Sequence, residues 1–118
     1  MIPGKIRRQS DASTIVDRAW KTQTAWERMR GLLGRKKLLE QEALLIVPCS
    51  SVHTIGMSYE IDIVYLDAQG KVLKTVSRLK PLRFSFCSGA HYTLELSGGF
   101  LARCPLLKGE TVEWQGSL

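Results

Sequence analysis

Residues 61–76, IDIVYLDAQGKVLKTV, contain the clearest structural signal in the chain. Two runs rich in β-branched and apolar residues, 61–66 and 71–76, flank the polar connection Asp67-Ala-Gln-Gly70. Asp and Gly supply the turn chemistry that a short hairpin connection needs. The segment therefore predicts a β-hairpin near the middle of the chain.

Shorter segments on both sides of this hairpin have the same composition and are bounded by Gly, Pro or polar clusters, which is typical of strands. They are residues 14–20, 43–47, 50–55, 91–96 and 111–114. Residues 1–12 are polar, and we expect them to be frayed and flexible.

One helix is predicted between the first two of these strands. Thr24 and Glu27 have the spacing of a capping box, in which each side chain satisfies a backbone donor at the helix start. Apolar residues then recur at helical spacing, which predicts a short amphipathic helix over residues 25–33 with Gly34 after its end. Gly31 inside it costs about 1 kcal/mol relative to Ala, and a close contact between helix and sheet is one reason for its presence.

These elements predict a mainly β chain with one short helix, in the α+β class. The architecture that we expect is a small antiparallel β-sandwich or a partly open β-barrel. A length of 118 residues leaves room for a single domain. Strands and helices do not alternate, so a doubly wound nucleotide-binding fold is disfavoured.

The net charge of +6 lies entirely in residues 1–40, which hold ten basic and four acidic side chains. This excess could form a solvated face, or it could meet nucleic acid, an anionic membrane surface or an acidic partner protein. No helix-turn-helix, zinc-finger or RNA-recognition signature accompanies it, which argues against nucleic acid as the ligand. The candidate basic face consists of Arg28, Arg30, Arg35, Lys36 and Lys37.

Few features of the sequence indicate targeting, a disulfide or a metal site. No apolar run approaches the roughly 20 residues that span a bilayer. The N-terminal cations are not followed by the apolar run of a secretory signal, so we expect a cytoplasmic protein, and we expect a monomer. Three cysteines at irregular spacing, without a C-x-x-C pair, favour reduced thiols over disulfides or a zinc site.

Several motifs resemble the family known as domain of unknown function 192, found in bacteria and archaea. The resemblance covers residues 24–114 and is most specific over the run from His53 to Asp67, which reads HTIGMSYEIDIVYLD. It also includes the segment from Arg28 to Arg35, the Leu94-Glu95-Leu96 element with Gly99, and the Gly109-Glu110 turn. The resemblance implies a compact β-rich fold and implies no reaction.

His53 is the central candidate for chemistry, because a neutral imidazole can act as a base or as a metal ligand near neutral pH. Its plainer role is a hydrogen bond within the sheet, with Asp62 as one partner. His53 and Met57 could both ligate copper, but two ligands do not make a site, so we predict no metal and no cofactor. The candidate ligand-binding residues are Cys49, Ser51, His53, Thr54, Met57, Asp62 and Glu95.

Asp62 and Glu95 each interrupt an apolar strand. Simple alternation would place both carboxylates on the wet face, an expectation that is stronger for Glu95 than for Asp62. The other reading is a pair that flanks a cleft and performs acid–base chemistry.

No complete catalytic or metal constellation can be assembled from these residues. We therefore expect a small, non-enzymatic module that binds a small molecule or a protein through the loop from Cys49 to Met57, with Asp62 beside it. The alternative is a hydrolase-like or metal-binding enzyme that uses His53 with Asp62 or Glu95.

Overall fold

The structure is a computed structural model and describes residues 1–116. Within that range it contains nine strands and two short helices. In chain order they are β1 (Ile2–Arg8), β2 (Thr14–Lys21), α1 (Ala25–Arg30), β3 (Glu42–Ile46), β4 (Ser51–His53), β5 (Ile61–Leu66), β6 (Val72–Leu79), β7 (Phe84–Phe86), β8 (Tyr92–Ser97), α2 (Phe100–Arg103) and β9 (Val112–Gly116).

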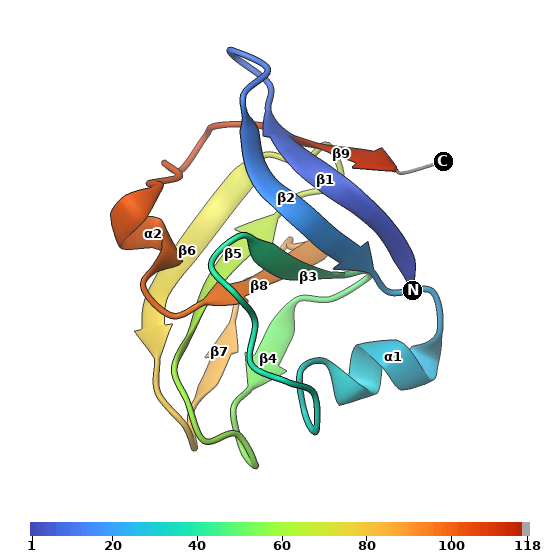
Figure 1. The fold of residues 1–118 in the computed structure, drawn as a ribbon, viewed down its shortest axis with the longest axis vertical. Helices are drawn as coiled ribbons and strands as arrows, with labels where there is room; N and C mark the ends of the chain where they lie inside the picture. The colour runs from blue at the N-terminus through green and yellow to red at the C-terminus, as the bar shows by residue number, and fades with distance from the viewer. Residues whose placement is uncertain (117–118) are drawn as a thin grey trace.

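Seven strands form one strongly curled sheet in the order β6-β5-β8-β3-β2-β1-β9 (Figure 1). Only the β2–β3 pair is parallel among these neighbours. The two outer strands meet at one end, where Val72 donates to the carbonyl of Glu110 and Lys71 forms a bridge with Thr111. The sheet therefore closes into a partly open barrel, and the prediction of a mainly β, α+β fold is confirmed.

Apolar side chains cover both faces of the central strands. One core fills the inside of the curled sheet and includes Val64, Leu94 and Phe100 of α2. A second core lies on the outer face of β3, β5 and β8 and includes Ile46, Ile63 and Tyr65. Because β5 is buried on both faces, its sequence is continuously apolar apart from Asp62.

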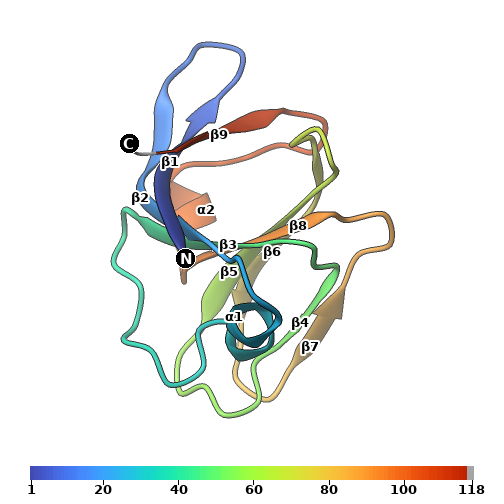
Figure 2. The same ribbon diagram turned by 90° about the vertical axis from the view of Figure 1, so that its right-hand side faces the viewer.

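The second core is covered by the turn after α1, which contributes Leu32, and by the small sheet that β4 and β7 form, which contributes Val52, with α1 lying beside them (Figure 2). This small sheet is fastened to the large one through side chains. The Tyr65 hydroxyl on β5 lies 2.9 Å from the Ser85 hydroxyl on β7, and Lys74 on β6 donates to the carbonyl of Phe86.

Several expectations need correction. Residues 2–8 are strand β1, paired on both sides, so the prediction that residues 1–12 are flexible is wrong for this segment. Strand β7 and helix α2 were not predicted, because each is short and held by contacts from distant parts of the chain. The predicted helix ends at Arg30 rather than at residue 33, and Gly31 is its C-cap.

The predicted capping box at Thr24 and Glu27 is present. The predicted apolar face of the helix is not buried, since Trp26 and Met29 are 67% and 71% exposed. No helix in the described range is long and apolar enough to cross a membrane.

Candidate functional site

A small hollow lies between α1 with its following turn and strand β4. It has a volume of about 70 Å³, and we call it the Glu95 groove. Its walls come from residues 28–33 on one side and from Cys49, Ser51, Val52, His53, Ile55 and Met57 on the other, with Ile46 and Glu95 beneath. Five of the seven sequence-predicted candidates therefore line one hollow: Cys49, Ser51, His53, Met57 and Glu95.

Glu95 is the unusual group in this groove. It lies on β8, opposite Leu44 on β3 and Ile63 on β5, so its side chain shares the outer face of the sheet with these apolar residues. It is only 5% exposed, and its Oε2 atom has no hydrogen-bond partner among residues 1–116. Burial raises the pKa of Glu95 to about 7, because an apolar surrounding disfavours the charged form.

Gly31 brings the turn after α1 close to this carboxylate. Its φ of 52° lies in the left-handed region, which glycine adopts without steric cost. A Cβ atom at this position would stand 3.4 Å from Oε1 of Glu95 and 3.8 Å from Cδ1 of Ile46. The close contact between helix end and sheet that the sequence suggested for Gly31 is therefore present.

Strand β4 forms the opposite wall. Ser51 and His53 are paired with Phe86 and Phe84 on β7, and their side chains point outward, whereas Val52 points into the core. The Cys49 thiol donates to the carbonyl of Ser51 over 3.1 Å. Across the described residues, no hydrogen bond joins His53 to Cys49, Ser51, Asp62 or Glu95, so a nucleophile–base pair is not assembled here.

Asp62 belongs to the opposite face of the sheet. It lies across from Leu96, and its oxygens accept hydrogen bonds from the backbone N–H groups of Arg78, Gly99 and Leu101 at 2.8, 3.1 and 2.8 Å. The proposed Asp62–Glu95 acid–base pair is therefore wrong, and so is the expectation that both carboxylates lie on a wet face. The suggested His53–Asp62 hydrogen bond is not formed.

Thr54 is also structural. It is fully buried, and its hydroxyl oxygen lies 2.6 Å from the carbonyl of Lys80 and accepts from the N–H of Arg83. These bonds fix the loop that connects β6 to β7. Thr54 and Asp62 thus hold the framework around the groove and do not line it.

Tyr59 was not among the sequence-based candidates. Its buried hydroxyl has no hydrogen-bond partner in the part of the chain that the structure describes, and burial together with the charge of Glu95 raises the pKa of Tyr59. No local pattern marks Tyr59, because its proximity to Glu95 arises only when β8 packs beside the loop before β5.

The predicted basic face is split by the fold. Arg28 and Arg30 line the Glu95 groove, whereas Arg35, Lys36 and Lys37 line a different hollow of about 360 Å³ with Trp20 and Leu44. Within the described range no group of three or more His, Cys, Asp or Glu side chains is arranged to hold a metal ion.

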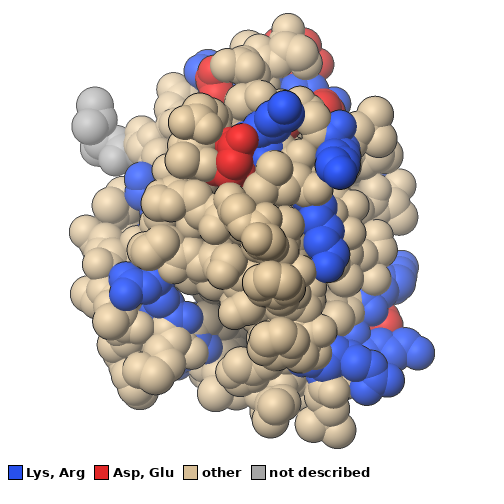
Figure 3. All heavy atoms as spheres, turned by 180° about the vertical axis from the view of Figure 1, so that it is seen from behind, with Lys and Arg blue, Asp and Glu red and all other residues tan. Residues whose placement is uncertain are grey.

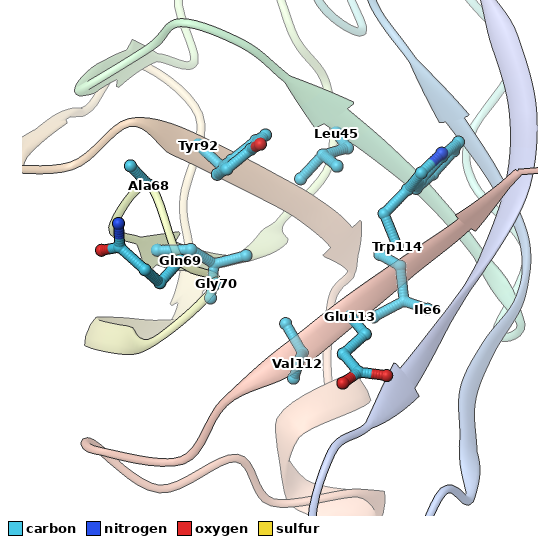
Figure 4. A pocket seen from close by; sticks show the side chains of 10 residues that line it. Ile6, Leu45, Ala68, Gln69, Gly70, Tyr92, Val112, Glu113 and Trp114 are labelled. Carbon is cyan, nitrogen blue, oxygen red and sulfur yellow. The ribbon is translucent and has the colours of Figure 1, made fainter.

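A third hollow, of about 240 Å³, opens at the barrel wall. Figure 4 shows Tyr92 and Trp114 on either side of it, with Leu45 between them and Gly70 and Val112 nearer its lower edge. Its lining is mostly apolar, and none of its ten residues is a buried polar group without a partner. Its chemistry is therefore less specific than that of the Glu95 groove.

Comparison with known proteins places these features in a family. The model of domain of unknown function 192, described as "Uncharacterized ACR", matches residues 6–114. The chain belongs to this family. The resemblance seen in the sequence motifs is thereby confirmed, and the match extends further towards the N-terminus than the motifs did.

Two solved structures share the fold. A protein of unknown function from Novosphingobium aromaticivorans is 22% identical, with a TM-score of 0.78 over 95% of this chain and 84% of that one. A Sinorhizobium meliloti protein described as a "putative transcription regulator" is 15% identical, with a TM-score of 0.80 over 96% and 92%. At these identities the likeness shows the fold alone. No curated protein matches the chain.

Proposed function

We propose that this member of the domain of unknown function 192 family is a non-enzymatic binding module and that the Glu95 groove is its ligand site. The ligand donates a hydrogen bond to the carboxylate at the bottom of the groove. Binding, rather than catalysis, fits the geometry because, among the described residues, the His53 side chain makes no hydrogen bond to Cys49, Ser51 or Glu95, and the Cys49 thiol donates only to the backbone carbonyl of Ser51.

The observation that carries this proposal is the unpartnered Oε2 of Glu95 beneath an open hollow. A buried carboxylate oxygen without a donor is costly, by about 1–3 kcal/mol or more. Buried polar groups in folded proteins are nearly always paired, so an exception that faces a hollow indicates a missing partner. A ligand hydroxyl, amide or amine that reaches this oxygen would recover that free energy on binding.

The test is a titration of the full chain with acetamide and methylammonium, two small donors, followed by NMR of the Glu95 side-chain carboxyl carbon. We expect both probes to shift this resonance, and we expect methylammonium to lower the pKa of Glu95, because a bound cation favours the carboxylate. Glu95→Gln should remove the pKa response.

A blocking variant provides the control. Ser51 has an exposed side chain at the groove wall, so Ser51→Trp should obstruct entry without burying a polar group. Ser77→Trp places the same bulk at an exposed position on β6 and should leave probe binding unchanged. Shifts that persist in Ser51→Trp, or that fall only around Tyr92 and Trp114, would place the ligand site elsewhere.

A further inference from the structure

The free edge of β4 faces the Glu95 groove. Ser50 accepts a hydrogen bond from Cys87, and Thr54 donates one to Arg83, both across the β4–β7 pair. Hydrogen-bonded pairs alternate along an antiparallel ladder, so Val52 is the bonded residue between them, and the backbone groups of Ser51 and His53 point away from β7.

These outward backbone groups are available to a partner. In the described part of the chain the N–H groups of Ser51 and His53 and the carbonyl of His53 make no hydrogen bond, and the Ser51 carbonyl receives only the Cys49 thiol. On the opposite edge of the small sheet, the Phe86 carbonyl on β7 accepts from the Lys74 ammonium, a stronger donor than a thiol. The β4 edge is the one that borders the Glu95 groove.

The surface around this edge is apolar. Seven of the nine large apolar side chains that are well exposed in the described range come from α1 and its turn, or from β4, β7 and their flanking loops. Phe84 and Phe86 are 71% and 55% exposed and share their face with Ser51 and His53. Clustered exposed apolar side chains mark interaction surfaces more often than a solvated face.

The charge on this side is mainly positive. Figure 3 faces the side on which β4 and β7 lie, and it shows a broad uncharged middle with Lys and Arg side chains towards its margins and few acidic groups in its lower half. Arg28 and Arg30 line the groove itself. Acidic residues on either side of a bound segment would be attracted to these Lys and Arg side chains.

We infer that the Glu95 groove takes an extended peptide segment of a partner protein, which adds to the free edge of β4 as a further strand and places a donor-bearing side chain against the Glu95 carboxylate. Main-chain bonds to Ser51 and His53 give the affinity, and the pocket over Glu95 selects one side chain, as in other cases of strand addition. Acidic residues flank that side chain in the segment. This inference rests on the proposed function and specifies its ligand class.

The experiment uses a phage-displayed library of random linear peptides, selected on the full chain and counter-selected on Ser51→Trp. The best peptide is then synthesised as a series in which each backbone nitrogen is methylated in turn. Pairing along one edge predicts a loss of about tenfold or more in affinity at every second residue and little change at the residues between, because only alternate N–H groups face β4.

A matched pair of protein variants tests the same contact from the other side. Ser51→Pro removes an N–H that faces the groove, whereas Ser51→Ala keeps it, and neither changes a bond to β7. We expect Ser51→Pro to weaken the selected peptide about tenfold more than Ser51→Ala does, because Ser51→Ala keeps the backbone donor and removes only the hydroxyl. If Ser51→Pro does not fold, the methylation series decides alone, because it alters only the peptide.

Each other outcome separates this inference from the proposed function. A peptide that depends on Glu95 but tolerates methylation at every position overturns strand addition and leaves the groove as a binding site. The inference is also overturned if the selection enriches no peptide whose binding depends on Ser51 and Glu95. The acetamide and methylammonium titrations test independently whether the groove is a binding site. If those titrations fail as well, both proposals are wrong.

Discussion

Asp62 and Glu95 leave the same pair of strands on opposite faces of the sheet. Asp62 on β5 lies across from Leu96 on β8, and Glu95 on β8 lies across from Ile63 on β5. The Asp62 carboxylate accepts hydrogen bonds from three backbone N–H groups. Oε2 of Glu95, in contrast, has no hydrogen-bond partner among the described residues. Asp62 therefore has a structural role, whereas the proposed ligand contact belongs to Glu95.

Asp62 should be essential for stability. It accepts from Arg78, which has a positive φ of 51°, and from Gly99 and Leu101 at the start of α2, where the N-cap residue is Gly99 and has no side chain that could cap the helix. Asp62→Ala leaves two buried N–H groups and a third, partly buried one without their acceptor, so we expect a loss of about 3 kcal/mol or more in the free energy of unfolding. Urea unfolding measures this loss.

Asp62→Asn is the conservative comparison, because its carbonyl oxygen can still accept and its loss should be smaller. Glu95→Gln should not destabilise the chain. Equal unfolding free energies for wild type and Asp62→Ala would contradict the structural role of Asp62.

Glu95 should make the stability of the protein fall as pH rises. Its pKa is about 7 in the folded chain, against the ordinary value of 4.5 for a glutamate side chain. Between these values the folded state holds a proton that the unfolded state has released, so stability is complete below the lower pKa and is lost as pH rises through the upper one. The shift corresponds to about 3 kcal/mol. Glu27, with a pKa lowered to about 2, titrates below this window.

Urea unfolding of wild type and Glu95→Gln at about pH 5 and about pH 8 checks this expectation. The difference between the two proteins should change by about 3 kcal/mol between these conditions, in favour of Glu95→Gln at the higher pH. If the difference in unfolding free energy between the two proteins is the same at both pH values, the Glu95 carboxylate is solvated or paired.

The parts of this structure that could be predicted from the sequence are those that depend on residues close to one another along the chain. The hairpin around Asp67 and Gly70 and the capping box of Thr24 and Glu27 are encoded within a few positions, and both are present. The position of Asp62 was not predictable in this way. A central strand that is buried on both faces shows no alternation, so the face of a single polar residue cannot be inferred from its neighbours.

The Glu95 groove contains residues that are close in sequence and residues that meet only through the fold. Cys49, Ser51, His53 and Met57 are close in sequence, and the structure places them along one wall of the groove. Glu95 and Gly31 meet them only through the packing of β8 and of the turn after α1, and the apolar exposure of Met29 contradicts its helical spacing. Contacts between distant segments decide such features, and no local pattern records them.

Gly31 should tolerate alanine poorly. Gly31→Ala puts a side chain at a positive φ of 52° and its Cβ in contact with Oε1 of Glu95, at 3.4 Å, so we expect a loss of about 2 kcal/mol in stability. Gly109 also has a positive φ, of 96°, but nothing lies within 4 Å of a Cβ there. Gly109→Ala should lose only about 1 kcal/mol, and the difference reports the contact with Glu95. Equal losses in the two variants would argue that the turn after α1 does not press on the carboxylate.

The exposed aromatic pair on β7 should serve binding and not folding. Phe84 and Phe86 are 71% and 55% exposed, so little apolar area is lost when they are replaced. We expect the double change Phe84→Ser with Phe86→Ser to alter the free energy of unfolding by less than about 1 kcal/mol. Phe100→Ser is the control for a core position, because Phe100 is 4% exposed, and it should lose about 4 kcal/mol.

The same double variant should weaken the selected peptide, because Phe84 and Phe86 share the outward face of the small sheet with Ser51 and His53. Loss of binding with unchanged stability would assign the aromatic pair to the docking surface. Unchanged binding would confine the bound segment to the groove between β4 and α1. A large loss of stability would mean that these rings pack against the chain, contrary to the exposed positions that they occupy here.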